Sequence, residues 1–254
     1  MNEVEYRAIP ALSATSAKWI LRSPAHYKHR MENRVESVTF DVGHAVHAKV
    51  LGVGAGVVTY PDEHLTPSGN VSTKKDTVAW AQEQRAAGLT PISPDQMAAV
   101  DAMAEAVLTH PIAGPLLELP GETEVPLVAD CPATGVRIKG RIDRLARDGG
   151  RLIPVDLKTT PDASPETFPQ HIAKYAYDIQ GAMYRRLIQI VLGVDADPFR
   201  IVAVEKEPPY AVAVHDVTGW YAEIGEARLD RAIARFAEAT KTDTWPAYPP
   251  VVNE

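Results

Sequence analysis

The chain has 254 residues, enough to bury a sizeable core, and its hydrophobic content of 45% fits a globular protein. It contains no apolar run long enough to span a bilayer and no secretory signal at its start, so we expect a cytoplasmic protein without a membrane partner. Cys131 is the single cysteine, which excludes an internal disulfide and a four-cysteine zinc or iron–sulfur site.

The net charge of −7 argues mildly against a protein that coats nucleic acid, because non-specific binding depends on phosphate contacts from lysine and arginine. The basic residues nevertheless gather in two stretches. Against only three aspartates, residues 136–160 hold Arg137, Lys139, Arg141, Arg144, Arg147, Arg151 and Lys158. The first forty residues hold Lys18, Arg22, Lys28, Arg30 and Arg34. Any one of these arginines is most simply a solvated surface charge.

Two short helices are predicted near the start of the chain. Ser13 is suited to be the N-cap of a helix that runs through Leu21, and Ser23-Pro24 begins the second helix. The second helix carries His26, Tyr27, Lys28, His29 and Arg30. Basic and aromatic side chains on two short helices could grip a DNA backbone.

A third helix is predicted from Asp41 to Leu51, because its valines recur every four residues and Gly52 would end it. His47 falls on a face beside this stripe, together with Gly43, whereas His44 points elsewhere. A lone helical histidine is usually a surface or core residue, so the pattern alone gives His47 no function.

The middle of the chain is predicted to form a strand and helices whose role is packing. A short strand is expected at Val57–Tyr60, followed by helices at Asp76–Ala87 and Pro94–Thr109 that face solvent, the second capped by Ser93. Glu122–Ala129 reads as a strand. Glu124 within it is most simply a surface residue.

The strongest local pattern is a hairpin made of Val136–Ala146 and Arg151–Thr159, with turn residues Asp148-Gly149-Gly150 between them. Strand alternation places Asp143, Asp156 and Lys158 on one face. The opposite face receives the apolar residues Val136, Ile138, Ile142, Ile153, Val155 and Leu157. Diagonal neighbours lie about 7–8 Å apart, so the two aspartates could share one divalent ion while the lysine orients a water. The alternative is a solvated polar face on an ordinary hairpin.

A long helix is predicted from Gln170 to Leu192, ended by Gly193, with Gln180 and Tyr184 one turn apart beside its apolar stripe. Strands near Phe199–Glu205 and Ala211–Val217 and a helix over residues 219–240 follow. No GxxxxGK[ST] phosphate loop occurs, which excludes an ATP-driven motor.

The ordered strings GRIDR, VDLKTT and YDIQGAMYRRL resemble the PD-(D/E)XK nucleases, and among them the RecB-type and exodeoxyribonuclease VIII-type (phage recombination exonuclease) group. LSATSAKWILRSPAHYKHR and GHAVHAKVLG resemble the same group, so the likeness covers most of residues 10–190. It implies an α/β fold with a mixed central sheet flanked by helices. We expect one domain over 1–254: basic N-terminal helices in 1–35, a catalytic core in 36–193, and C-terminal strands, helix and tail in 194–254.

The resemblance also implies roles for individual residues. Asp143, Asp156 and Lys158 are the expected catalytic residues, with Gln180 and Tyr184 orienting the substrate strand. The expected ligands of Mg²⁺, or of Mn²⁺, are His47, Asp143, Asp156, the carbonyl of Leu157 and, by order only, Glu124. The expected DNA contacts come from Lys28, Arg30, Arg137, Lys139, Arg141 and Tyr177.

The activity implied is Mg²⁺-dependent exonucleolytic degradation of linear double-stranded DNA from free ends, with 5′ to 3′ polarity, in recombination or repair. A single-strand-annealing partner and a homo-oligomeric ring are implied by the same analogy. Three alternatives stay open: a nuclease-fold DNA-binding or assembly protein without turnover, a metal-dependent endonuclease, and a hydrolase of small phosphoesters.

Overall fold

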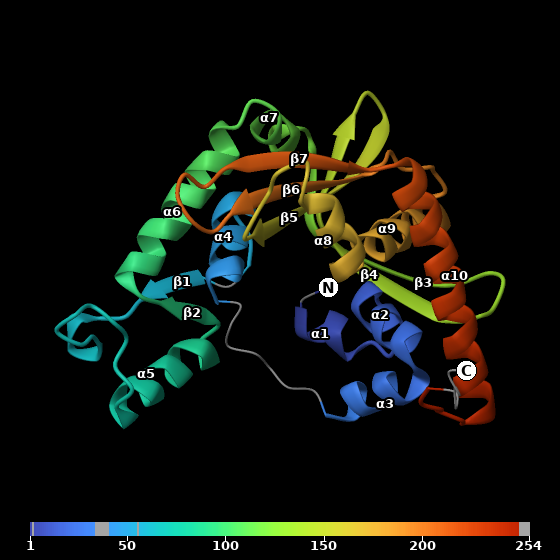
Figure 1. Cartoon of the computed structure of the whole chain (residues 1–254), viewed down its shortest axis with the longest axis horizontal. Helices are drawn as coiled ribbons and strands as arrows, with labels where there is room; N and C mark the ends of the chain where they lie inside the picture. Colours follow the sequence, from blue (N-terminus) through green and yellow to red (C-terminus); the bar gives the residue numbers. More distant parts are fainter. Residues whose placement is uncertain (2, 34–40, 55, 249–254) are drawn as a thin grey trace, which may run out of the picture.

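The structure is a computed structural model that describes residues 1, 3–33, 41–54 and 56–248 (Figure 1). Arg34, noted above among the basic residues, lies outside this part of the chain. A five-stranded mixed sheet stands at the centre, in the order β3 (Gly121–Asp130), β4 (Arg137–Asp148), β5 (Arg151–Thr160), β6 (Phe199–Glu205) and β7 (Val212–Val217). Neighbouring strands are antiparallel except β5 and β6, which are parallel. The expected α/β class with a mixed sheet is confirmed.

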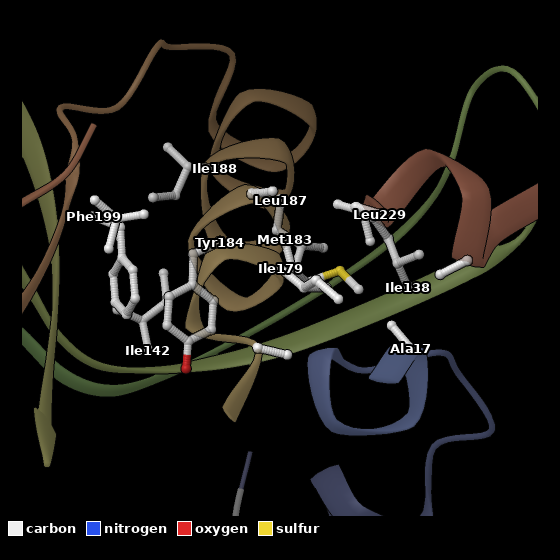
Figure 2. Packing of buried hydrophobic residues seen from close by; sticks show 14 of the residues in the cluster. Ala17, Ile138, Ile142, Ile179, Met183, Tyr184, Leu187, Ile188, Phe199 and Leu229 are labelled. Carbon is white, nitrogen blue, oxygen red and sulfur yellow. The ribbon is translucent and has the colours of Figure 1, made fainter. Parts of the chain in front are cut away.

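Helices cover both faces of this sheet. One face packs against α2 (Ala14–Arg22), α9 (Tyr177–Leu192) and α10 (Gly219–Thr242), and the other against α4 (Asp41–Leu51), α6 (Pro94–Thr109) and α7 (Ala113–Glu118). Figure 2 shows the first of the two cores, where α9 side chains meet the sheet. Successive side chains of β6 point to opposite faces of the sheet: Ile201 belongs to the hydrophobic cluster beside α9, and Val202 belongs to the cluster beside α4 and α6.

One predicted feature of the hairpin is wrong. Ile138 and Ile142 lie in the cluster beside α9, whereas Ile153, Val155 and Leu157 lie in the cluster beside α4 and α6. Ala146 of β4 lies in that second cluster as well, so the alternation of β4 is interrupted between Ile142 and Ala146. A strand with an irregularity turns its later side chains to the other face, which simple period-two alternation does not anticipate.

The predicted helix starts agree with the structure. Ser13 caps α2, Ser23 caps α3 (Pro24–Glu32), and Ser93 caps α6, each by accepting a hydrogen bond from a backbone N–H of the first turn. The helix expected over 170–192 is instead divided into α8 (Phe168–Tyr175) and α9, because Ala176 between them has φ 62°. A left-handed residue interrupts the hydrogen-bond ladder of a right-handed helix.

The remaining elements stand beside the main sheet. They are α1 (Glu3–Ala8), the parallel pair β1 (Gly56–Thr59) and β2 (Leu89–Ile92), a short 3₁₀ turn at Asp62–His64, and α5 (Lys75–Ala86). The sequence did not predict β2, since a four-residue strand containing proline has little pattern to detect. Within the described ranges, no helix combines the length and apolar character needed to cross a membrane.

Candidate active site

The candidate site lies where β4 and β5 separate. Their ladder begins at Asp148↔Arg151, beside the left-handed Gly149 and Gly150 of the turn, and extends to Arg144↔Val155. Asp143 and Asp156 are the next residues in that register. The backbone N–H of Leu157 donates a 3.0 Å hydrogen bond to Oδ2 of Asp143, which fixes this carboxylate between the two diverging strands.

Glu124 joins the site from β3 through an unusual backbone conformation. The β3–β4 register passes from Thr123↔Arg144 to Val125↔Ile142, and Glu124 between these pairs has φ 53°. A residue with a β-carbon in this region costs on the order of 1–3 kcal/mol, and such strain is concentrated at functional sites. Glu124 thus lies beside the part of β4, between Ile142 and Ala146, in which the side chains change to the other face of the sheet.

His47 connects α4 to both carboxylates. Its Nε2 atom lies 2.6 Å from Oδ2 of Asp143, and its Nδ1 atom lies 3.3 Å from Oε1 of Glu124. One ligand atom from each of the three residues lies within 4.8 Å of the others, close enough to hold one ion. His44 on the same helix is exposed, so the structure brings His47, and not His44, to the carboxylates.

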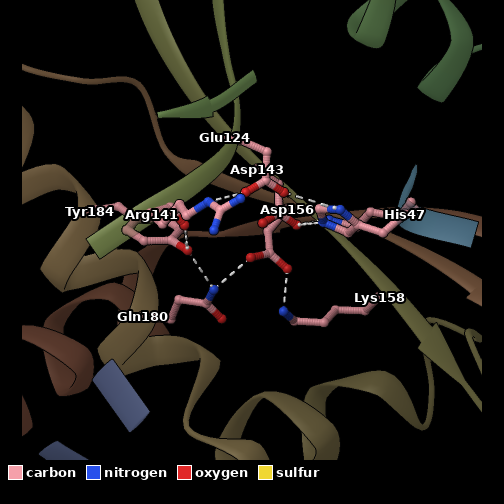
Figure 3. Close-up of polar contacts among 9 residues, drawn as sticks. His47, Glu124, Arg141, Asp143, Asp156, Lys158, Gln180 and Tyr184 are labelled. Atoms are coloured by element: carbon pink, nitrogen blue, oxygen red, sulfur yellow. Dashed lines mark hydrogen bonds and ion pairs between the residues drawn. The ribbon is translucent and has the colours of Figure 1, made fainter. Parts of the chain in front are cut away.

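Asp156 and Lys158 form the second half of the site (Figure 3). The Asp156 side chain is 1% exposed, its Oδ1 accepts a 2.5 Å hydrogen bond from Nε2 of Gln180, and its Oδ2 forms an ion pair with Nζ of Lys158. Gln180 also donates to Oη of Tyr184 at 2.9 Å, and Tyr184 donates to the Arg141 carbonyl at 2.6 Å. This chain of hydrogen bonds fixes the Asp156 carboxylate from α9.

The pKa values of the two aspartates are shifted in opposite directions. Burial and the charge of Asp143 raise the pKa of Asp156 to about 6, although Lys158 acts in the opposite direction. Burial would also raise the pKa of Asp143, but the hydrogen bond and charge of His47, together with Lys158, lower it below its ordinary value. The lysine and the imidazole therefore stabilise one ionised carboxylate, and the second is left with a tendency to take up a proton.

The two basic groups respond to the same carboxylates. Burial lowers the pKa of His47, but the hydrogen bond and charge of Asp143, with the charges of Asp156 and Glu124, bring the net shift upward. Burial likewise disfavours the charged form of Lys158, but Asp156 and Asp143 raise its pKa above the ordinary value. Lys158 is therefore an ammonium ion at neutral pH, held by Asp156 and 5.2 Å from the centre of the Tyr177 ring.

The donor set fits a hard divalent cation. The imidazole of His47 and the carboxylates of Asp143 and Glu124 can each offer one atom to a common ion, and Asp156 lies on the neighbouring strand, where its charge interacts with that of Asp143. Oxygen-rich sites of this kind suit Mg²⁺ or Mn²⁺. Burial first, and then the charge of Asp143, raise the pKa of Asp156 although Lys158 lowers it. A cation bound beside Asp156 would favour the ionised form of this carboxylate.

One predicted DNA contact needs correction. Lys139 is only 9% exposed, and its ammonium donates to the carbonyls of Tyr6, Arg7 and Ile9 at 3.0, 3.2 and 2.7 Å. These three bonds use all the donors of the ammonium, so Lys139 anchors the chain at the end of α1 and cannot reach a phosphate. Position in a basic stretch did not reveal that this side chain points into the protein.

The other predicted contacts have different surroundings. Arg141 forms an ion pair with Glu124, which the sequence did not predict. Arg137 makes a bidentate pair with Asp130, at 2.8 and 3.2 Å, on the surface. Lys28 lies over the Trp245 ring and Arg30 over the Trp19 ring, at 5.7 and 4.7 Å from the ring centres.

The sequence matches the profile of a known protein family. The profile of a family described as "PDDEXK-like domain of unknown function (DUF3799)" matches residues 13–251. A crystal structure from Eubacterium rectale titled "Putative exonuclease" is 14% identical, over 94% of this chain and 87% of that chain, with a TM-score of 0.60. A phage-related exonuclease from Haemophilus somnus 129PT is 11% identical over 94% and 100%, with a TM-score of 0.40. At 14% identity the first structure shows a similarity of fold alone, and the second structure is too dissimilar to support a conclusion. No curated protein matches the sequence.

Proposed function

Because the chain belongs to the PDDEXK-like DUF3799 family, we propose that it is a metal-dependent exodeoxyribonuclease that degrades linear double-stranded DNA. One observation carries the proposal. At the open end of the β4–β5 hairpin, a buried Asp156 paired with Lys158 stands beside an Asp143 that is bonded to His47. Two carboxylates, an imidazole and an ammonium in this arrangement suit the hydrolysis of a phosphodiester.

In this proposal Asp143, Asp156 and His47 would hold Mg²⁺, or Mn²⁺, with the Leu157 carbonyl and Glu124 as further ligands. Such an ion would supply Lewis acidity, which polarises a phosphate and lowers the pKa of a water. Glu124 is oriented toward His47 by its strained backbone and by its ion pair with Arg141.

The residues of the chain itself supply position and charge. Lys158 can donate a hydrogen bond to the attacking water or to a phosphate oxygen, where it stabilises the negative charge that develops in the transition state. Gln180 fixes the rotamer of Asp156, and Tyr184 fixes Gln180 through its own bond to the Arg141 carbonyl. These two residues of α9 therefore keep the carboxylate aligned with the hairpin.

The substrate proposal extends beyond the site. Lys28, Arg30, Arg137 and Arg141 would contact the DNA backbone, and a free end is the simplest entry point in a chain without a phosphate loop. Polarity from 5′ to 3′, a role in recombination or repair, a single-strand-annealing partner and a ring-shaped homo-oligomer are proposed from the family resemblance alone.

The test uses end-labelled linear duplex and covalently closed circular duplex, each with Mg²⁺ and with a chelator. The wild type should digest the linear DNA only when Mg²⁺ is present. Asp156→Asn should abolish digestion, whereas Asp148→Asn, which changes a half-exposed acid paired with Arg151 at the turn of the same hairpin, should leave it unchanged. Nicking of circles as fast as loss of linear DNA would replace the exonuclease by an endonuclease, and binding without cleavage would indicate a protein that has lost turnover.

A further inference from the structure

An exposed tyrosine lies between two lysines close to the candidate site. Tyr175 ends α8 and is 42% exposed. Lys18 from α2 and Lys174 from α8 hold their ammonium groups 5.8 and 5.3 Å from the centre of its ring. Two helices from distant parts of the sequence thus place positive charge around one accessible aromatic ring.

This ring is linked to the catalytic lysine through a second tyrosine. The Tyr175 and Tyr177 ring centres are 5.8 Å apart, and Nζ of Lys158 lies 5.2 Å from the centre of the Tyr177 ring. Two aromatic contacts therefore lead from Lys158 to the exposed surface of Tyr175. A strand bound with its scissile phosphate at Lys158 would pass this surface within a few nucleotides.

The backbone is distorted in a way that creates this pair of rings. Residues two apart in a continuous helix do not face each other, but Ala176 between the two tyrosines has φ 62° and separates α8 from α9. A left-handed alanine is unfavourable by roughly 1–2 kcal/mol, so the packing around it must hold it in place. The distortion keeps both rings on the same side of the chain.

The inner side of Tyr175 is supported by the fold. The His171 ring meets it edge-on with centres 5.6 Å apart, and Nδ1 of His171 lies 3.1 Å from Oγ1 of Thr160 at the end of β5. The tyrosine is therefore connected to the strand that carries Asp156 and Lys158. A fixed ring loses little conformational freedom when a flat ligand stacks on it.

We propose that Tyr175, with Lys18 and Lys174, forms a stacking site for a base of single-stranded DNA that continues from the strand bound at Lys158. Bases inside a duplex stack on one another, so only an unpaired base can offer a face to the ring. Lysines beside a stacking ring can move to the phosphates that flank the base. The link to the scissile phosphate rests on the proposed function; the stacking site itself does not.

The test measures binding without cleavage. Wild type and variants are titrated, in a chelator, into a single-stranded oligodeoxythymidine that carries one 2-aminopurine, a base whose fluorescence is quenched by stacking. Tyr175→Leu should bind about tenfold more weakly, within the range for loss of one base–aromatic stack, and should lose the protein-dependent quenching. Tyr175→Trp should retain both, and Lys18→Gln with Lys174→Gln should reduce the dependence of binding on salt.

The matched control is Trp220→Leu, which removes another exposed ring, at the start of α10, and should change neither signal. Unchanged affinity and quenching in Tyr175→Leu would overturn the proposal, and so would a Tyr175 dependence as large for blunt duplex as for the single strand. If binding behaves as expected but the wild type digests no DNA with Mg²⁺, the proposed nuclease fails while the stacking site stands. If digestion occurs and Tyr175→Leu binds like the wild type, the reverse holds.

Discussion

Nε2 of His47 lies 2.6 Å from Oδ2 of Asp143, which joins helix α4 to the strand that begins the candidate catalytic hairpin. Replacing His47 by asparagine should weaken Mn²⁺ binding by at least about tenfold, because even a residue that only supports a metal ligand contributes that much. Isothermal titration calorimetry measures the effect. His44→Asn, exposed on the same helix, is the control, and equal affinity in the two variants would remove His47 from the site.

Metal binding by the wild type should depend on pH. The imidazole of His47 binds a metal only when neutral, and its neighbouring carboxylates raise its pKa above 6.5. Protons should therefore begin to compete with Mn²⁺ at a pH above 6.5, and affinity should fall further near pH 6, where Asp156 takes up its proton. Titrations between pH 8 and pH 5 at constant salt measure this. A flat profile would contradict both assignments.

Asp156→Asn should stabilise the protein in chelator at neutral pH. The folded-state pKa of Asp156 is raised from 3.8 to about 6, so the native state of the wild type holds this proton more tightly than the unfolded chain. The wild type therefore loses stability as the pH rises from 3.8 to 6, by up to about 3 kcal/mol. The variant avoids this loss, so its advantage should be full above pH 6 and vanish below pH 4.

Urea unfolding at several pH values measures that difference, with Asp148→Asn as the control. Added Mg²⁺ should reverse the order at pH 7, because the wild type keeps the Asp156 ligand and therefore gains more binding energy from the ion than the variant does. A variant that is less stable than the wild type in chelator at pH 7 would show that Asp156 is ionised and well compensated without a metal.

The Lys158→Gln variant should lose its turnover of DNA but retain its affinity for duplex DNA. The ammonium acts on charge that develops during the reaction, so we expect the rate of digestion to fall at least about a hundredfold. Duplex binding in chelator should change by no more than a few fold. The control is Lys49→Gln, whose lysine pairs with Asp101 on the surface, and it should digest DNA like the wild type. A loss of binding as large as the loss of rate would make Lys158 a substrate anchor.

Lys139→Met should destabilise the fold and leave the salt dependence of DNA binding unchanged. The substitution leaves three carbonyls near the end of α1 without their donor, at a cost of about 1–3 kcal/mol each at most. Arg137→Gln is the comparison, since this exposed arginine should affect DNA binding and not stability. Thermal unfolding and a salt series of binding constants separate the two effects.

The local elements of the site could be predicted from the sequence. Asp148-Gly149-Gly150 supplies the left-handed residues of a tight turn, which fixed the hairpin that carries Asp156 and Lys158. Helical spacing alone placed Gln180 and Tyr184 on one side of α9, where Gln180 donates hydrogen bonds to both Asp156 and Tyr184. Capping serines, one of them followed by proline at the start of α3, predicted where α2, α3 and α6 begin.

Only the tertiary structure decided which side chains meet. The approach of His47 to Asp143 joins elements far apart in the chain, and the inward direction of Lys139 depends on the carbonyls at the end of α1 that accept its hydrogen bonds. The left-handed Glu124 and Ala176 are held by the packing around them and violate their own backbone preferences. Periodicity and turn chemistry report the energy of neighbouring residues, whereas strain, burial and ion pairing across the fold are determined by contacts that no local pattern contains.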